Sequence, residues 1–195
     1  FIFIDGCDDG ANEMESFIQA NAALMEAWVN SGGALFLNAA PNVGDGMDLA
    51  FGGFQLIYPQ STGTANASNP GHPIFNGPNL PVGNQWTGNS FAHAIITPPG
   101  QNYASLIVNA ANQLDVLSEV NWGQGTVLFG GMTLPIFQDL GFSSGPHPEI
   151  GNLHTNMLQY LADNASAEIV VYLDENGEGI LGVEDIDGGS TDNCG

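Results

Sequence analysis

The chain opens with two short apolar runs separated by a segment with the hydrophobic spacing of an amphipathic helix. Phe1–Asp5 (FIFID) and Ala34–Asn38 (ALFLN) are almost wholly apolar, and each ends in a polar residue. Runs of this kind are typical of buried parallel strands. Between them, apolar residues recur at helical spacing as far as Trp28, and Asn30–Gly33 (NSGG) is a helix-stop signal. The order strand, helix, strand predicts a βαβ unit and therefore a parallel sheet.

The helix in this unit has an expected start and an expected buried face. Asn12 followed by Glu15 matches an Asn-type capping box, which predicts that the helix begins there. The residues expected to face the core are Phe17, Ile18, Leu24, Met25 and Trp28.

More strands are predicted within and after a middle segment, residues 39–99, that is rich in Gly, Asn and Pro, and a second helix is predicted after it. The expected strands are Phe54–Tyr58, Phe91–Thr97, Ser105–Val108, Leu114–Val120 and Thr126–Gly130. The expected helix buries Ile150, Leu153, Met157, Leu158 and Leu161. ADNASAE (Ala162–Glu168) then precedes a segment with strand periodicity. We therefore expect an α/β domain over residues 1–163, with a mainly parallel sheet and flanking helices. Residues 164–195 are expected to be a linker and the first strands of a β repeat.

Charge changes the picture of possible partners. The chain has no Lys or Arg and 21 Asp and Glu, so its formal net charge at pH 7 is −21. Without cations it cannot neutralise phosphates, which excludes a nucleic-acid-binding role. A surface with this much negative charge needs counterions, and calcium is the expected counterion outside a cell. No apolar run reaches the roughly 18 residues of a membrane-spanning helix, and no signal peptide is recognised.

Five segments, in this order, resemble the glutamine-amidotransferase-like, or ThuA-like, flavodoxin-type domain. They are FIFIDG, LMEAWVNSGGALFLN, GHPIF, WGQGTVLFGG and NLHTNMLQYLA. The resemblance implies a flavodoxin-like sheet, and in that family one more strand and helix would precede FIFIDG. It also implies where catalysis would occur: amidotransferases of this fold place a Cys on a sharp turn after a central strand, and an HPE motif supplies His and Glu.

The catalytic set implied by that resemblance is incomplete in this chain. HPE is present at His147–Glu149, but Ala39–Pro41 (AAP) follows the strand ALFLN, where the nucleophile is expected. Cys7 follows a different strand, in an acidic loop. A triad without its nucleophile cannot transfer an acyl group. We therefore expect no enzymatic activity.

Residues 169–195 resemble the opening of a repeat found in SprB-type gliding adhesins and other very large surface proteins of Bacteroidota. The shared pattern is an apolar strand, LD-x-N-G, a second strand and DID-x-GS-x-DNCG, as in IVVYLDENGEGILGVEDIDGGSTDNCG. The resemblance implies Ig-like β-sandwich modules, export by type IX secretion and an extracellular, cell-surface location. In those repeats the cysteine of DNCG pairs with one farther along the module, so Cys194 is not expected to bond to Cys7.

One group of candidate calcium ligands has the spacing of an EF-hand-type loop. Positions 1, 3, 5 and 12 of that pattern are Asp174, Asn176, Glu178 and Asp185. The flanking residues have a strand pattern rather than a helical one, and Asn176 with Gly177 favours a β-hairpin turn instead. The loop and the hairpin remain alternative interpretations of these letters.

A second group of candidate calcium ligands follows the first predicted strand. Asp5, Asp8 and Asp9 lie at the carboxyl end of that strand, where α/β folds usually bind ligands. Acids at the start of a helix also suit the helix dipole, which is the structural alternative. Calcium is the only cofactor that these residues suggest.

The remaining candidates are histidines and tryptophans. His72, His93, His147 and His154 have no metal-ligand spacing. His154 is expected to have a packing or capping role on the last helix. Trp86 and Trp122 lie among Asn and Gln and are candidates to contact a sugar, with core anchoring as the alternative.

Together these features predict a non-catalytic module of a very large secreted cell-surface adhesin or filament protein, serving adhesion or structural spacing. The expected partners are neighbouring domains of the same chain and a surface polysaccharide, with no nucleic acid and no membrane span. The alternative is an extracellular ThuA-like hydrolase acting on polysaccharide-derived substrates. A shared pocket of His147, Glu149 and the Asp5–Asp9 loop would favour the hydrolase.

Overall fold

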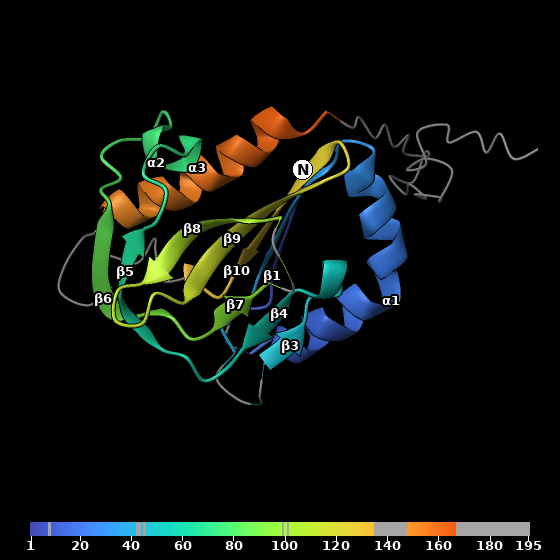
Figure 1. Ribbon diagram of the computed structural model, residues 1–195, viewed down its shortest axis with the longest axis horizontal. Coiled ribbons are helices and arrows are strands. Elements are labelled where there is room, and N and C mark those ends of the chain that lie inside the picture. The colour runs from blue at the N-terminus through green and yellow to red at the C-terminus, as the bar shows by residue number, and fades with distance from the viewer. Residues whose placement is uncertain are drawn as a thin grey trace, which may run out of the picture.

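The computed structural model describes residues 1–7, 9–41, 44, 46–98, 100, 102–134 and 148–166 of the 195-residue chain. In this part a seven-stranded sheet lies between two layers (Figure 1). The helices are α1 (Ala11–Asn30), α2 (Pro73–Asn76) and α3 (Pro148–Asn164), with a short 3-10 turn at Phe51–Gly53. The strands are β1 (Ile2–Asp5), β2 (Ala34–Asn38), β3 (Gly46–Asp48), β4 (Gln55–Ile57), β5 (Thr62–Ala67), β6 (Gln85–Ala92), β7 (Ile95–Thr97), β8 (Ala104–Asn109), β9 (Asp115–Trp122) and β10 (Gly125–Gly130).

The predicted parallel unit is present and occupies one end of the large sheet. The strand order is β1-β2-β10-β9-β8-β5-β6. β1 pairs with β2 in parallel, from Ile2 opposite Leu35 to Asp5 opposite Asn38, and β10 pairs with the other side of β2 in parallel. The two apolar runs of the predicted unit are therefore confirmed as adjacent parallel strands, and the predicted strand Thr126–Gly130 supplies the third. Their carboxyl ends meet at one edge of the sheet.

The expectation of a mainly parallel, flavodoxin-like sheet was wrong, because the sheet is mixed. From β10 onward every pair, β10-β9, β9-β8, β8-β5 and β5-β6, is antiparallel. The connection between β9 and β10 has no room for the crossover that parallel neighbours require. It turns at Gly123, whose φ is +62° and where a Cβ would lie 2.0 Å from Asn30 Oδ1. The coarser expectation, an α/β fold with a sheet core and flanking helices, is confirmed.

Two other strand predictions also differ from the structure. The run Phe91–Thr97 is divided, because its first part ends β6 in the large sheet and its last part is β7. β7 belongs to a separate sheet of order β3-β4-β7, in which Phe54–Tyr58 contributes β4. A single apolar run can therefore serve two sheets when the chain bends between them.

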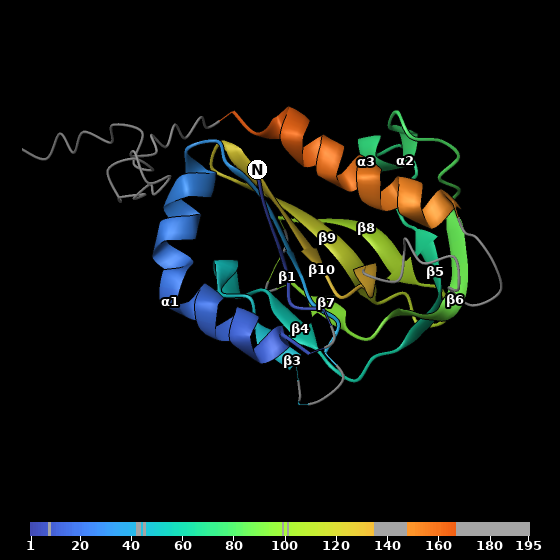
Figure 2. The same ribbon diagram turned by 180° about the vertical axis from the view of Figure 1, so that it is seen from behind.

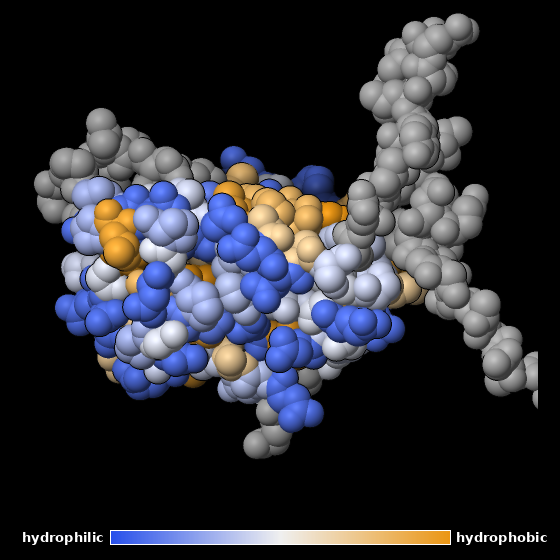
Figure 3. Space-filling model, turned by 90° about the horizontal axis from the view of Figure 1, so that it is seen from above, coloured by the Kyte–Doolittle hydropathy of each residue, from blue (hydrophilic) through white to orange (hydrophobic). Residues whose placement is uncertain are grey.

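The large sheet is covered on both faces (Figures 1 and 2). β2 is buried at every position, and its side chains alternate between two cores. Leu35 and Leu37 belong to the core that includes α1 and the small sheet, whereas Phe36 belongs to the core that includes α2 and α3. Viewed from above, the described surface is mostly hydrophilic, with smaller hydrophobic areas between (Figure 3).

The expected start of α1 was wrong. The helix begins at Ala11 after Gly10, and no side chain caps it. Asn12 and Glu15 lie inside the helix, so they cannot form a capping box. The Glu15 carboxylate instead accepts a hydrogen bond from Asp48 N at 2.8 Å, which joins α1 to β3. The local pattern predicted that the Glu15 side chain caps the helix, but in the structure it makes a tertiary contact instead.

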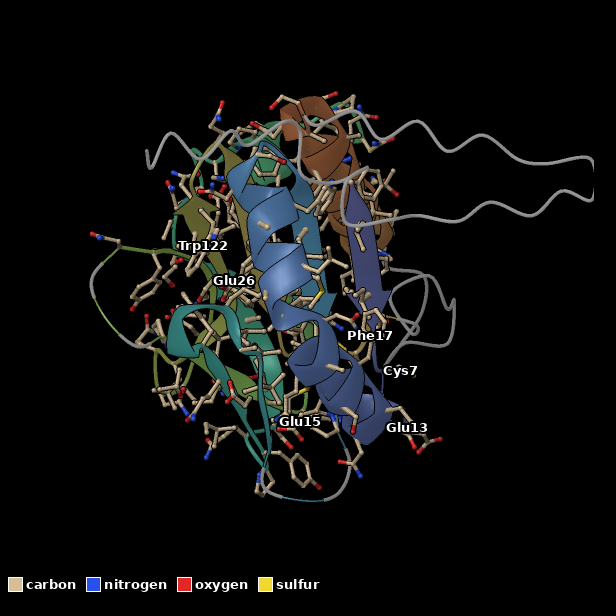
Figure 4. All side chains as sticks on the ribbon, turned by 90° about the vertical axis from the view of Figure 1, so that its right-hand side faces the viewer. Cys7, Glu13, Glu15, Phe17, Glu26 and Trp122 are labelled. Atoms are coloured by element: carbon tan, nitrogen blue, oxygen red, sulfur yellow. The ribbon has the colours of Figure 1, made fainter. Side chains whose placement is uncertain are left out.

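The buried face of α1 is close to the prediction, with one clear exception. Ile18, Met25 and Trp28 are buried as expected, but the side chain of Phe17 is 50% exposed. Met14 takes its place toward the sheet, since it lies one helical turn before Ile18. Figure 4 shows Phe17 on the outside of α1.

α3 agrees with the prediction for the last helix. Ile150, Leu153, Met157 and Leu161 are buried against the sheet. Just after the helix, Ser166 N donates to Gly32 O at 2.9 Å. The expected Ig-like strands, and the candidate calcium loop from Asp174 to Asp185, lie outside the described residues. None of the described helices is long and apolar enough to cross a membrane.

Candidate functional site

The carboxyl edge of β1, β2 and β10 is joined by hydrogen bonds between its own residues. Asn38, which is fully buried, donates from Nδ2 to Asp5 Oδ1 at 2.9 Å and to Met132 O at 2.8 Å. Its Oδ1 accepts from Met132 N at 3.0 Å. The side chain of Asn38 thus connects the ends of all three parallel strands. Its polar atoms are used for structure at the place where α/β folds usually bind ligands.

Cys7 occupies a strained turn at the same edge. Its φ is +38°, in the left-handed region that residues with a Cβ rarely adopt. The turn is held by Cys7 N donating to Asp5 Oδ1 at 2.9 Å and by Ala40 N donating to Cys7 O at 2.9 Å. Cys7 is a free cysteine among the described residues; Cys194 lies outside them, so the expectation that the two are not bonded stays a prediction. Figure 4 shows Cys7 near the N-terminal end of α1.

The acidic loop does not assemble into a metal site in the described part of the chain. Asp5 points to Asn38 and to the backbone of Cys7, whereas Asp9 is exposed. Asp8 lies outside the described residues. Among the residues that are described, no three His, Cys, Asp or Glu side chains form a group suited to a metal ion. Calcium binding at Asp5, Asp8 and Asp9 stays a prediction.

The residues that follow β2 carry no nucleophile. Ala39 and Ala40 are fully buried, and the backbone O of Ala40 lies 3.1 Å from His93 Nδ1. Glu149 lies in the first turn of α3, and His147 is outside the described residues. The shared pocket that would favour a hydrolase includes His147 and so lies partly outside the described residues.

His154 packs on the sheet, as the sequence suggested. Its ring lies edge-on to that of Phe3, with 5.8 Å between ring centroids. Burial lowers the pKa of His154, and the charge of Asp5 opposes that shift only in part. A neutral imidazole on α3 can therefore lie against β1 without an ion pair.

A buried polar triad, which the sequence did not reveal, joins α2 and α3 to the centre of the sheet. His72 Nε2 lies 3.0 Å from Glu119 Oε2, and the Tyr160 hydroxyl donates to Glu119 Oε1 at 2.5 Å. His72 and Glu119 are each only 8% exposed. Because His72 Nδ1 accepts from Ile74 N, the ring proton lies on Nε2 and is donated to the carboxylate.

The triad keeps a buried carboxylate charged. Burial by itself raises the pKa of Glu119, but the hydrogen bonds from His72 and Tyr160 prevail and lower it below the ordinary value. The same contact acts in the opposite direction on Tyr160: burial and the Glu119 carboxylate raise the pKa of its hydroxyl. At pH 7 Glu119 is thus an ionised acceptor and Tyr160 a neutral donor.

Acid should therefore weaken this triad. A carboxylate whose folded pKa is lowered stabilises the fold above its unfolded pKa and loses that contribution as pH falls through the folded pKa. We expect Glu119→Gln to lower the melting temperature at pH 7, and the difference from wild type to shrink below about pH 4. Melting curves from pH 2.5 to 7 measure it, with exposed Glu13→Gln as control. A difference that does not change with pH would contradict the role given to Glu119.

A groove lies at the other end of β9, where that strand extends past its neighbour. β8 begins at Ala104, which pairs with Glu119, so the last three residues of β9 have no partner on that side. A groove of about 280 Å³ there is lined by Phe54, Tyr103 and Trp122. Figure 4 places Trp122 on the opposite side of α1 from Cys7.

The two tryptophans named as sugar-contact candidates have different environments. Trp86 is 3% exposed, stacks on Phe75 and Phe91, and donates from Nε1 to Val82 O at 2.8 Å. It is a core anchor. Trp122 is half-buried and lines the groove. The sequence context of both is rich in Asn and Gln, so only the structure separates them.

No protein-family model and no curated protein matches the chain. Among solved structures, a cytoplasmic protein from Salmonella typhimurium is similar, with 17% sequence identity and a TM-score of 0.47. The similarity covers 81% of this chain and 70% of that one. At such values it does not bear on activity, ligand or location.

Proposed function

We propose that this chain is a non-catalytic module of a very large, secreted cell-surface protein, where it serves adhesion or the spacing of neighbouring domains. The observation that carries the proposal is that the carboxyl edge of β1, β2 and β10 is closed, which means that its polar groups are hydrogen-bonded to one another. The polar atoms of Asn38 bond to the chain itself, and buried alanine methyls follow β2. An acyl-transfer site needs a nucleophile with a base at that edge.

The sequence supports the extracellular part of the proposal. The resemblance of residues 169–195 to adhesin repeats suggests a repeat-built surface protein, and the absence of Lys and Arg fits a chain exposed to trypsin-like proteases. Calcium is the counterion that we assign to the acidic surface. The neighbouring domains of the same chain are its constant partners.

One observation favours the alternative, an extracellular ThuA-like hydrolase. Cys7 has a left-handed φ between a strand and a helix, and enzymes with a nucleophile elbow hold the nucleophile on this kind of turn. A nucleophile also needs a base within hydrogen-bond reach. Among the described residues, no hydrogen bond joins the Cys7 thiol to a histidine. The expected base, His147, lies outside that part of the chain.

Activity measurements test the proposal. We expect the full chain to release no product from activated esters, primary amides or lactones above the rate of a heat-denatured sample. Cys7→Ser and His147→Ala are the diagnostic variants, and Phe17→Ala, at an exposed position on α1, is the control. Turnover that either diagnostic variant abolishes and the control retains would overturn the proposal in favour of the hydrolase.

A further inference from the structure

The groove at the end of β9 has two aromatic rings, one half-buried and one exposed, that each pack against a buried ring. The Trp122 ring lies edge-on to Phe51 at 5.6 Å between centroids, and the Tyr103 ring lies edge-on to Phe54 at 6.4 Å. Phe51 is fully buried and Phe54 is 4% exposed, whereas Tyr103 is 36% exposed. The contacts with buried rings therefore restrict the rotamers of the outer rings before any ligand arrives. Fixed aromatic surfaces reduce the entropy cost of binding.

A second depression adjoins the first one. It measures about 360 Å³ and is lined by Asn102, Tyr103, Glu119 and Asn121, so Asn102 and Tyr103 border both depressions. Side chains alternate along a strand, so Glu119 and Asn121 lie on one face of β9 and Trp122 on the other. A ligand long enough to cross Tyr103 can therefore contact both depressions.

The polar groups of the second depression can both donate and accept hydrogen bonds. The side chains of Asn102 and Asn121 are exposed, and no side-chain hydrogen bond to another described residue is found for either. Each amide has two donor hydrogens and an acceptor oxygen. The Glu119 carboxylate adds acceptor capacity beyond its bonds to His72 and Tyr160. This set matches hydroxyl groups, which also donate and accept.

The charge of the chain and the shape of the site limit the chemical class of ligand further. The chain has no Lys or Arg to balance an anionic ligand. A quaternary ammonium ligand would be attracted by the rings and by the Glu119 carboxylate but would leave the donors of both amides unused. A chain of sugar rings presents apolar C–H faces to aromatic rings and hydroxyls to amides, and small-molecule sites combine apolar walls with a few polar groups in this way.

We propose that the groove and the second depression, which lie on either side of Tyr103, form one binding site for a neutral, linear polysaccharide. One sugar ring stacks on Trp122 and Tyr103, and the next is hydrogen-bonded by Asn102, Asn121 and Glu119. The site deepens the proposed function and rests on it, since an adhesive module needs a surface ligand. It lies at the amino end of β10, away from the closed carboxyl edge.

Affinity electrophoresis of the full chain tests the site, in gels that contain a mixed-linkage β-glucan, a mannan or a galactan. We expect at least one of them to slow migration, and Trp122→Ala or Tyr103→Ala to raise the Kd about tenfold or more. Asn121→Ala should raise it about threefold. Trp122→Phe, which keeps an aromatic face, should retain most of the binding. Phe17→Ala should bind as wild type does.

Three results would overturn the inference: no retardation in any gel, retardation unchanged by Trp122→Ala in a folded variant, or binding of choline or alginate alone. Melting curves of each variant establish that it is folded. The results also distinguish failure of the binding site from failure of the proposed function. Groove-dependent binding with cleavage of the polysaccharide would support the site and contradict the non-catalytic role, whereas neither binding nor cleavage would overturn the site only.

Discussion

Asn38→Ala is expected to lower the free energy of unfolding by about 4 kcal/mol. The substitution leaves the N–H and the carbonyl of Met132 without a partner, and Met132 is fully buried. A buried polar group without its hydrogen bond costs about 1–3 kcal/mol. The bond to Asp5 is lost as well, and the missing amide leaves a small cavity. Three strand ends lose their common partner in one change.

Urea unfolding followed by circular dichroism measures this effect. Asn12→Ala is the matched control, because Asn12 is exposed and caps nothing, so we expect a change within about 0.5 kcal/mol of wild type. Asn38→Asp keeps the acceptor for Met132 N but places a carboxylate against Asp5, so it should destabilise more at pH 7 than at pH 4. If Asn38→Ala costs no more than Asn12→Ala, the closed edge does not hold the strand ends together.

Asn156→Ala is expected to have the next largest effect, about 3 kcal/mol. Asn156, on α3, is 1% exposed, and its Oδ1 accepts from both Asn79 N and Asn79 Nδ2 at 3.0 Å. Its Nδ2 donates to Ile74 O at 3.2 Å and to Asn79 O at 3.1 Å. One side chain thus pairs four polar atoms of the 74–79 segment, and the buried ones among them are costly to leave unpaired.

The same helix supplies a control one turn earlier. Asn152 makes a single bond, from Nδ2 to Pro81 O, at an exposed position, so Asn152→Ala should cost less than about 1 kcal/mol. Hydrogen exchange gives a local readout, because the Asn79 amide should lose protection in Asn156→Ala and keep it in Asn152→Ala. Equal effects of the two substitutions would contradict the assignment of Asn156 as the joint between α3 and α2.

The parallel part of the fold could be predicted because its signals are local. The apolar runs of β1 and β2, with a helix between them, determine a βαβ unit without reference to the rest of the chain. The antiparallel part could not be predicted in the same way. β8, β9 and β10 are as apolar as parallel strands, and the distinction lies in short connections such as the turn at Gly123.

The candidate sites were harder to predict than the strands, since their residues are distant in sequence. Glu119 looked like one polar residue of a strand, and its partners His72 and Tyr160 lie 47 and 41 residues away. Asp5 looked like a ligand because it ends β1, but its Oδ1 accepts a hydrogen bond from Asn38, 33 residues later. Trp86 and Trp122 were equally good candidates for sugar contact from the sequence, and only their burial in the structure distinguishes them.

The central claim is that this chain binds a neutral polysaccharide through Trp122 and leaves it uncut. An NMR titration with hexasaccharides of the same glucan, mannan and galactan tests both parts at once. We predict that the indole N–H signal of Trp122 shifts, that those of buried Trp28 and Trp86 do not, and that no new reducing-end signals appear over hours. An unmoved Trp122 signal with all three sugars, or new reducing-end signals, would contradict the account.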